Sequence, residues 1–154
     1  DGERQKALAE EILTSWNSTD GMLAQLSEFP DQRYADSHEA IAELLRVQVT
    51  ALDTLKKKLG TPLGRQSKGV PQPCQAEAWR SNASLANIGA SLASAERLWH
   101  GANKDGMQSM LDSDQDALKQ RIDAAYSVSR QKLAGLQRPL AELLTDDKGR
   151  AALN

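Results

Sequence analysis

Residues 37–60 have the sequence SHEAIAELLRVQVTALDTLKKKLG. Its apolar side chains recur at three- and four-residue steps, which predicts an amphipathic helix; they are Ile41, Leu44, Leu45, Val49, Leu52, Leu55 and Leu59. Asp36 or Ser37 can cap the start of this helix, and Gly60 ends it. The run Lys56–Lys58 places positive charge in the last turn, where it complements the helix dipole.

Similar apolar periods before and after this stretch predict further helices. Over residues 3–29 the apolar side chains predict one helix that runs through Gly21 and ends at Pro30, with Trp16 in the core; they are Leu8, Ile12, Trp16, Leu23 and Leu26. A third helix is capped by Ser81 or Asn82 and closed by Gly101, with a buried line of Leu85, Ile88, Leu92, Ala95 and Trp99.

The C-terminal third of the chain predicts a short turn around Met107 and a long helix from Ser113 or Asp114 to about residue 143. Pro139 lies within that pattern, so a kink or a break into two helices is expected there. A new helical pattern follows an N-cap at residues 146–147 and stops at the chain end. Because such a short terminal helix is marginal alone, we expect the chain to be a portion of a larger helical protein.

Composition and loop content complete the fold prediction. Leu and Ala dominate the apolar residues and aromatic residues make up 4%, which suits helices better than sheets. Residues 60–75 hold three prolines and three glycines and are expected to be an irregular loop. We therefore predict an all-α antiparallel helical bundle of about four main helices, forming a single unit over residues 1–154.

Charge and cysteine content exclude several classes of function. The net charge of −2 gives no general attraction to nucleic acid. No apolar run approaches the roughly 18 residues that a membrane span needs. The single cysteine, Cys74, excludes an internal disulfide and a cysteine-based zinc site within this chain.

The strongest candidate site is residues 75–88, QAEAWRSNASLANI. Here Trp79 and Arg80 precede the third helix, whose free N–H groups favour an anion. Arg80 offers a bidentate fork for a carboxylate or phosphate and Trp79 a flat apolar wall, while Ser84 adds a small polar contact. Glu77 could bind a cation or anchor Arg80. The alternative is structural: Arg80 pairs with Glu77 or caps a neighbouring helix, and Trp79 closes the end of the bundle.

Other chemistry-bearing residues favour structural interpretations. His38 and His100 are too few for a multi-histidine metal site, and no His-Glu-x-x-His pattern occurs. The acids at positions 112, 114 and 116 lack the glycine and glutamate of a calcium loop and suit a helix start. Cys74 is expected to be an incidental loop cysteine.

Three segments resemble the imelysin-like family (peptidase M75 type). They are GTPLG at residues 60–64, AEAWRSNASLANI at residues 76–88 and LQRPLAELLTDD at residues 136–147. The likeness runs along the whole chain, but to the C-terminal half of the family's domain. Asn82 stands where the family's pattern leads us to expect glycine, and nothing in the chain matches the family's Gly-x-His-x-x-Glu signature.

The resemblance implies an all-helical protein of two related bundle-like halves, exported by a bacterium to the periplasm or anchored at the outer membrane. It implies a role in iron or haem uptake, with a ligand site between the halves that Glu77, Trp79, Arg80 and Ser84 would line. Iron or another divalent metal would then be bound mainly by residues outside this chain, and the N-terminal half of the domain would be its partner. The alternatives are a zinc-type metallopeptidase with its ligands in that other half, and a structural helical module that packs against a partner.

Overall fold

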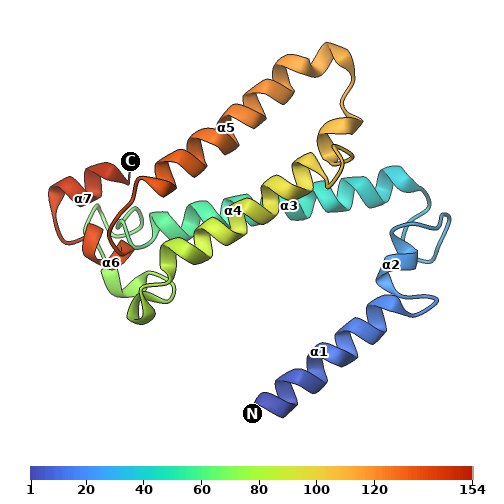
Figure 1. Ribbon diagram of the computed structural model, residues 1–154, viewed down its shortest axis with the longest axis horizontal. Coiled ribbons are helices and arrows are strands. Elements are labelled where there is room, and N and C mark those ends of the chain that lie inside the picture. Colours follow the sequence, from blue (N-terminus) through green and yellow to red (C-terminus); the bar gives the residue numbers. More distant parts are fainter. Residues whose placement is uncertain (154) are drawn as a thin grey trace. The chain divides into compact units, whose positions relative to one another are not determined.

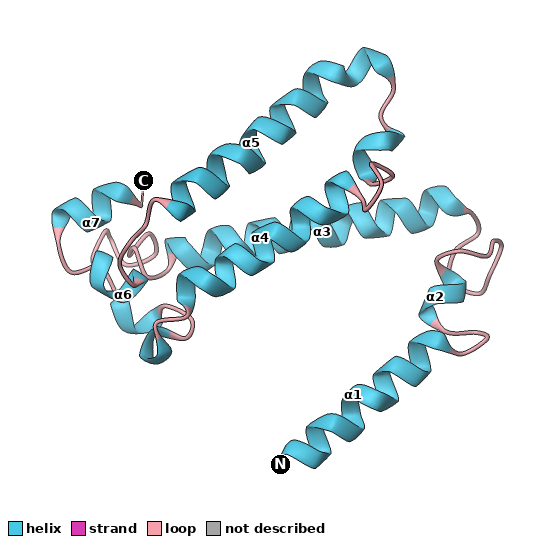
Figure 2. Ribbon diagram, in the orientation of Figure 1, coloured by secondary structure: helices cyan, strands magenta, loops and turns pink. Residues whose placement is uncertain are grey.

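The computed structural model describes residues 1–153, and this part of the chain consists of helices and loops without a β-strand (Figure 2). The all-α prediction is therefore confirmed. Four long helices correspond to the four expected: α1 (Gly2–Asn17), α3 (Ser37–Gly60), α4 (Ser84–His100) and α5 (Asp116–Ala134). The contacts divide the chain into two compact units, residues 1–49 and 50–154, with the boundary inside α3. That the whole chain forms one bundle stays a prediction.

In the first unit, residues 3–29 do not form the one continuous helix that the sequence predicted, so this prediction was wrong. α1 ends at Asn17, and a short α2 (Met22–Gln25) follows. Gly21 explains the break, because a Cβ there would lie 2.4 Å from the Ser15 carbonyl oxygen and 2.5 Å from that of Trp16. The chain therefore folds back tightly over the end of α1 at a position where any larger residue would collide with backbone.

The prediction that Trp16 lies in the core was also wrong. No residue of α1 is buried, and Trp16 is 47% exposed. Leu8 and Ile12 on the same helix are 50% and 60% exposed. An apolar period shows which face of a helix can be buried, but it does not show that another element covers that face.

α3 begins as predicted. The Asp36 carboxylate accepts a 3.0 Å hydrogen bond from the Glu39 N–H, so Asp36 serves as the cap, and Gly60 is the last helical residue. After α3 the loop of residues 61–83 contains two short 3₁₀ turns, η1 (Pro73–Gln75) and η2 (Trp79–Ser81). The irregular structure predicted for residues 60–75 is therefore confirmed, with η1 as the one short regular turn in that segment.

In the second unit α5 returns against the direction of α4 (Figure 1). Gly89 permits close packing, because a Cβ there would lie 3.2 Å from a methyl carbon of Leu133 on α5. Trp99 is only 6% exposed, which confirms it as a core residue. The connection contains η3 (Met107–Met110), which confirms the predicted turn, and then η4 (Ser113–Gln115).

The long fourth helix is broken, as one of the two alternatives predicted. η4 begins after Asp112, which forms a capping box with Gln115, so the α-helix itself starts at Asp116. α5 ends at Ala134, and α6 (Leu140–Leu143) starts after Pro139. α7 (Asp147–Ala152) follows, capped by Asp146, whose carboxylate accepts a 2.7 Å hydrogen bond from the Gly149 N–H.

A buried hydrophobic cluster of the second unit joins α6 to the loop before α4. Ala76, Leu140 and Leu144 are 3%, 1% and 1% exposed and pack together. Half-buried apolar side chains surround them: Leu59, Leu63, Trp79, Leu85 and Leu153. This core therefore holds in place the segment that contains the candidate site.

Asp146 makes the stability of this region depend on pH. The Gly149 N–H, together with Arg138 at 2.7 Å, holds the pKa of the Asp146 carboxyl below its usual value. A lowered folded-state pKa stabilises the fold above the unfolded pKa of about 3.9, and this contribution is lost as the pH falls through the folded value. We expect Asp146→Asn to have a lower Tm than the wild type at pH 7, with the difference shrinking as the pH falls below about 4. Thermal unfolding measured across this pH range tests it; a pH-independent difference would exclude the charge as its cause.

Candidate functional site

The predicted site residues lie on a compact backbone reversal that leads into α4. Ala78 and Asn82 flank η2, and both have left-handed backbone angles, with φ of 52° and 57°. Asparagine tolerates this conformation better than most residues, and glycine adopts it freely. The expectation of glycine at position 82 thus has a physical basis, and Asn82 fulfils the same backbone requirement.

The predicted cap of α4 was wrong. α4 begins at Ser84, its N-cap position is Ala83, and no side chain caps it. Ser81 instead donates its hydroxyl to the Ala78 carbonyl at 3.1 Å, and Asn82 closes η2. Two polar residues before an apolar period indicate a helix start, but the left-handed turn at Asn82 moves the start one or two residues further along the chain.

Ser84 is buried, with 2% exposure, and its hydroxyl donates a hydrogen bond to the backbone carbonyl of Glu77. This bond closes the reversal, since it joins the first residue of α4 to the residue before Ala78. Ser84 therefore acts on the site by fixing the backbone that carries Glu77, Trp79 and Arg80.

The structure brings Trp79 and Arg80 together but separates Arg80 from Glu77. The Arg80 guanidinium carbon lies 4.5 Å from the centroid of the Trp79 ring, in a cation–π contact. Glu77 pairs instead with Lys58 at the end of α3, with 2.6 Å between Nζ and Oε2. The alternative in which Arg80 pairs with Glu77 was wrong, because the Glu77 carboxylate forms its ion pair with the Lys58 ammonium group.

Trp79 has two roles in this arrangement. It packs against the buried cluster of Ala76, Leu140 and Leu144, which fixes its position. The guanidinium group of the exposed Arg80 also stacks on this half-buried ring. Within residues 1–153 no carboxylate pairs with Arg80, so its guanidinium group is open to an anionic ligand while the ring limits its freedom. A carboxylate beside a flat apolar surface is the chemistry that this pair can recognise.

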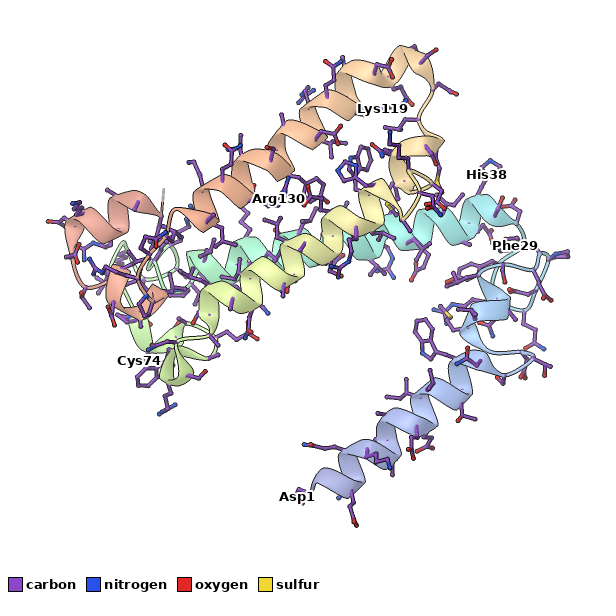
Figure 3. The ribbon with its side chains drawn as sticks, in the orientation of Figure 1. Asp1, Phe29, His38, Cys74, Lys119 and Arg130 are labelled. Carbon is purple, nitrogen blue, oxygen red and sulfur yellow. The ribbon has the colours of Figure 1, made fainter. Side chains whose placement is uncertain are left out.

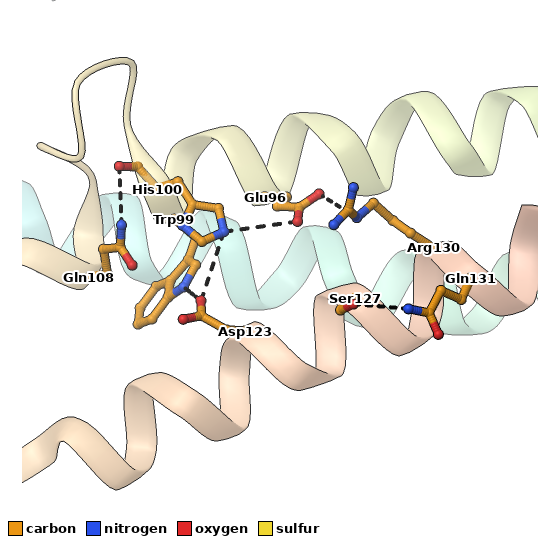
Figure 4. A network of polar contacts seen from close by, with 8 residues as sticks. All are labelled: Glu96, Trp99, His100, Gln108, Asp123, Ser127, Arg130 and Gln131. Carbon is orange, nitrogen blue, oxygen red and sulfur yellow. Dashed lines mark hydrogen bonds and ion pairs between the residues drawn. The ribbon is translucent and has the colours of Figure 1, made fainter.

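A second polar cluster joins α4 to α5, and sequence analysis missed it (Figure 4). Asp123 accepts a 2.7 Å hydrogen bond from the Trp99 indole, and its carboxylate lies 3.8 Å from His100 Nε2. Glu96 lies 3.9 Å from the same nitrogen and pairs with Arg130 at 3.0 Å. The four-residue spacing of Glu96 and His100 is a visible signal, but the partners on α5 are more than 20 positions away.

Neither cluster forms a metal site. Among residues 1–153, no group of three or more His, Cys, Asp or Glu side chains is arranged to hold a metal ion. In the second cluster, Arg130 and the Trp99 indole engage the two carboxylates that flank His100. We interpret this cluster as a structural link between the two helices.

Figure 3 shows the positions of two other candidates. His38 lies at the start of α3 and is exposed, with its ring nitrogen 3.8 Å from Asp36. Cys74 lies on the loop before α4 and is an exposed free thiol. The calcium-like acids are part of helix starts, as expected: Asp112 belongs to a capping box, and Asp116 pairs with Lys119 at 3.1 Å.

The family model for Imelysin (Peptidase_M75) matches residues 2–154. The chain belongs to the imelysin family. No curated protein and no solved structure matches it. That this imelysin chain corresponds to the C-terminal half of the family's domain stays a prediction.

The described part of the imelysin chain contains no membrane-spanning helix. None of the helices within residues 1–153 has both the length and the apolar character that a bilayer crossing requires. This agrees with the sequence, in which no sufficiently long apolar run occurs.

Proposed function

We propose that this imelysin-family chain is an exported bacterial binding protein that takes part in iron uptake, in the periplasm or anchored at the outer membrane. Its share of the ligand site is the reversal before α4, with Glu77, Trp79, Arg80 and Ser84. The remainder of the site, including the iron ligands, is supplied by residues outside this chain, in a second helical half of the domain.

The observation that carries the proposal is the Trp79–Arg80 pair. An exposed guanidinium group held over an indole ring suits an iron carrier that has carboxylates and a flat or apolar body, such as haem or ferric citrate. Arg80 would bind a carboxylate of the carrier, and Trp79 would contact its apolar part. Ser84 supports both by fixing the backbone, and Glu77 holds the Lys58 ammonium group nearby.

Titration of haem and of ferric citrate into the protein tests this proposal. We expect Glu77→Ala/Arg80→Ala to weaken binding about ten- to hundredfold, the range expected when a hydrogen bond to a charged group is lost. Arg97→Ala is the matched control, because it removes an exposed arginine from the last turn of α4. Equal affinity of the double variant and the wild type would remove these residues from the site. Chelator-sensitive proteolysis by the same preparation would favour the metallopeptidase alternative instead.

A further inference from the structure

The second unit contains an apolar groove that the proposed function does not use. It has a volume of about 300 Å³ and lies between α3, α4, α5 and α7. We name it the leucine groove after the side chains that dominate its walls, among them Leu55, Leu59, Ile88, Leu92, Leu133 and Leu136. Trp79, Arg80 and Glu77 are not among its lining residues.

The polar groups of the leucine groove all favour an anion. Lys56 and Lys132 line it together with Ser129, and no Asp or Glu of the described chain does. A lysine ammonium group beside an apolar wall complements a ligand with a negative head and an apolar tail.

Lys56 differs from its neighbours in the Lys56–Lys58 run. Lys57 pairs with Asp53 at 2.7 Å, and Lys58 pairs with Glu77 at 2.6 Å. Lys56 forms no ion pair with a carboxylate of residues 1–153, and it is the lysine of the three that lines the groove. Lys56 therefore places a positive charge at the wall of the groove, where it complements an anionic ligand.

The volume limits the size of the ligand. Ligand pockets usually measure about 300–1,000 Å³, so this groove is at the lower end and suits one short alkyl chain better than a two-tailed lipid. We propose that the leucine groove binds a linear alkyl monocarboxylate, with the carboxylate at Lys56 and the chain along the leucines of α3, α4 and α5.

Calorimetric titration with hexanoate, octanoate and decanoate tests this proposal, with octan-1-ol as the neutral comparator. Affinity should rise about fourfold for each added methylene until the groove is filled. Lys56→Met keeps the length of the side chain and removes its charge, so it should weaken octanoate binding about tenfold and leave octan-1-ol unchanged. Lys57→Met is the matched control on the same helical turn, and it should bind octanoate as the wild type does.

Ser129→Phe adds a ring at an exposed position that lines the groove, so it should reduce binding of both octanoate and octan-1-ol while the fold persists in circular dichroism. No binding of any acid, equal losses in the Lys56 and Lys57 variants, or full binding in the Ser129 variant would each overturn the proposal. A stable dimer in light scattering that octanoate neither binds nor dissociates would also overturn it, by showing that a second copy covers the groove.

Discussion

Leu140→Ala should lower the free energy of unfolding by about 2–5 kcal/mol, the range measured for removing buried leucine side chains. Leu140 is 1% exposed and packs in one cluster with Ala76 and Leu144. Truncation would leave a cavity between α6 and the loop before α4, because the surrounding side chains can only partly relax into it. Urea unfolding followed by circular dichroism measures the effect.

Leu118→Ala on α5 is the control for this substitution. Leu118 is 41% exposed, so its replacement should change the free energy of unfolding by no more than about 0.5 kcal/mol. Similar losses in the two variants would mean that the α6 cluster is not the core of the second unit. Trp79 packs on the same cluster, so the Leu140 variant should also loosen the candidate site.

Gly149→Ala should destabilise the protein by about 1–3 kcal/mol, the usual cost of overpacking. Helix propensity alone predicts the opposite, since alanine is favoured over glycine by about 1 kcal/mol within a helix. The steric effect dominates here, because a Cβ at position 149 would lie 2.1 Å from the Leu143 carbonyl oxygen. That atom belongs to the backbone of α6 and cannot move aside as a flexible side chain can.

Gly135→Ala provides the matched comparison. Gly135 follows α5 with φ of −73°, and the nearest atom to its added Cβ would be 3.4 Å away. Alanine fits there without strain, so this variant should be more stable by about 0.4–1 kcal/mol. The two substitutions are chemically identical, and opposite shifts of the urea midpoint are expected. Stabilisation by both would contradict the close packing of α7 on α6.

Much of the helical structure could be predicted because its signals are local. The apolar period of α3, its cap at Asp36 and its end at Gly60 all lie within a few residues of the features they determine. The N-cap of α7 at Asp146 is equally local. Such signals are physical contacts between near neighbours in sequence, so a single sequence contains them.

The errors arise where a distant or backbone contact decides the outcome. Gly21 lies inside an apolar period that suits a helix, and only its approach to the carbonyls of residues 15 and 16 breaks the helix. Trp16 has the spacing of a core residue, yet it is 47% exposed. Periodicity specifies an apolar face, while burial depends on what else packs there.

Sequence analysis named the candidate residues but did not determine their pairings. The contact between Trp79 and Arg80 joins adjacent residues, so their proximity was evident. The pairing of Glu77 with Lys58 joins residues on either side of a long loop, and no local pattern indicates it. The hydrogen bond from Ser84 to the Glu77 carbonyl depends on the left-handed backbone of Ala78 and Asn82. The sequence alone did not indicate this backbone conformation at either residue.

The three tryptophans allow a direct test of the central claim, that the Trp79–Arg80 pair is the ligand contact. Trp16, Trp79 and Trp99 should give three indole N–H signals in a ¹⁵N–¹H correlation spectrum, which Trp79→Phe and Trp16→Phe would assign. Gallium(III) citrate or gallium(III) protoporphyrin can replace the paramagnetic iron complexes in the titration. We predict that the Trp79 indole and the Arg80 side chain shift with saturation while the buried Trp99 does not. An unchanged Trp79 signal, with a saturable shift at Trp16 or Trp99, would contradict the assignment of the site.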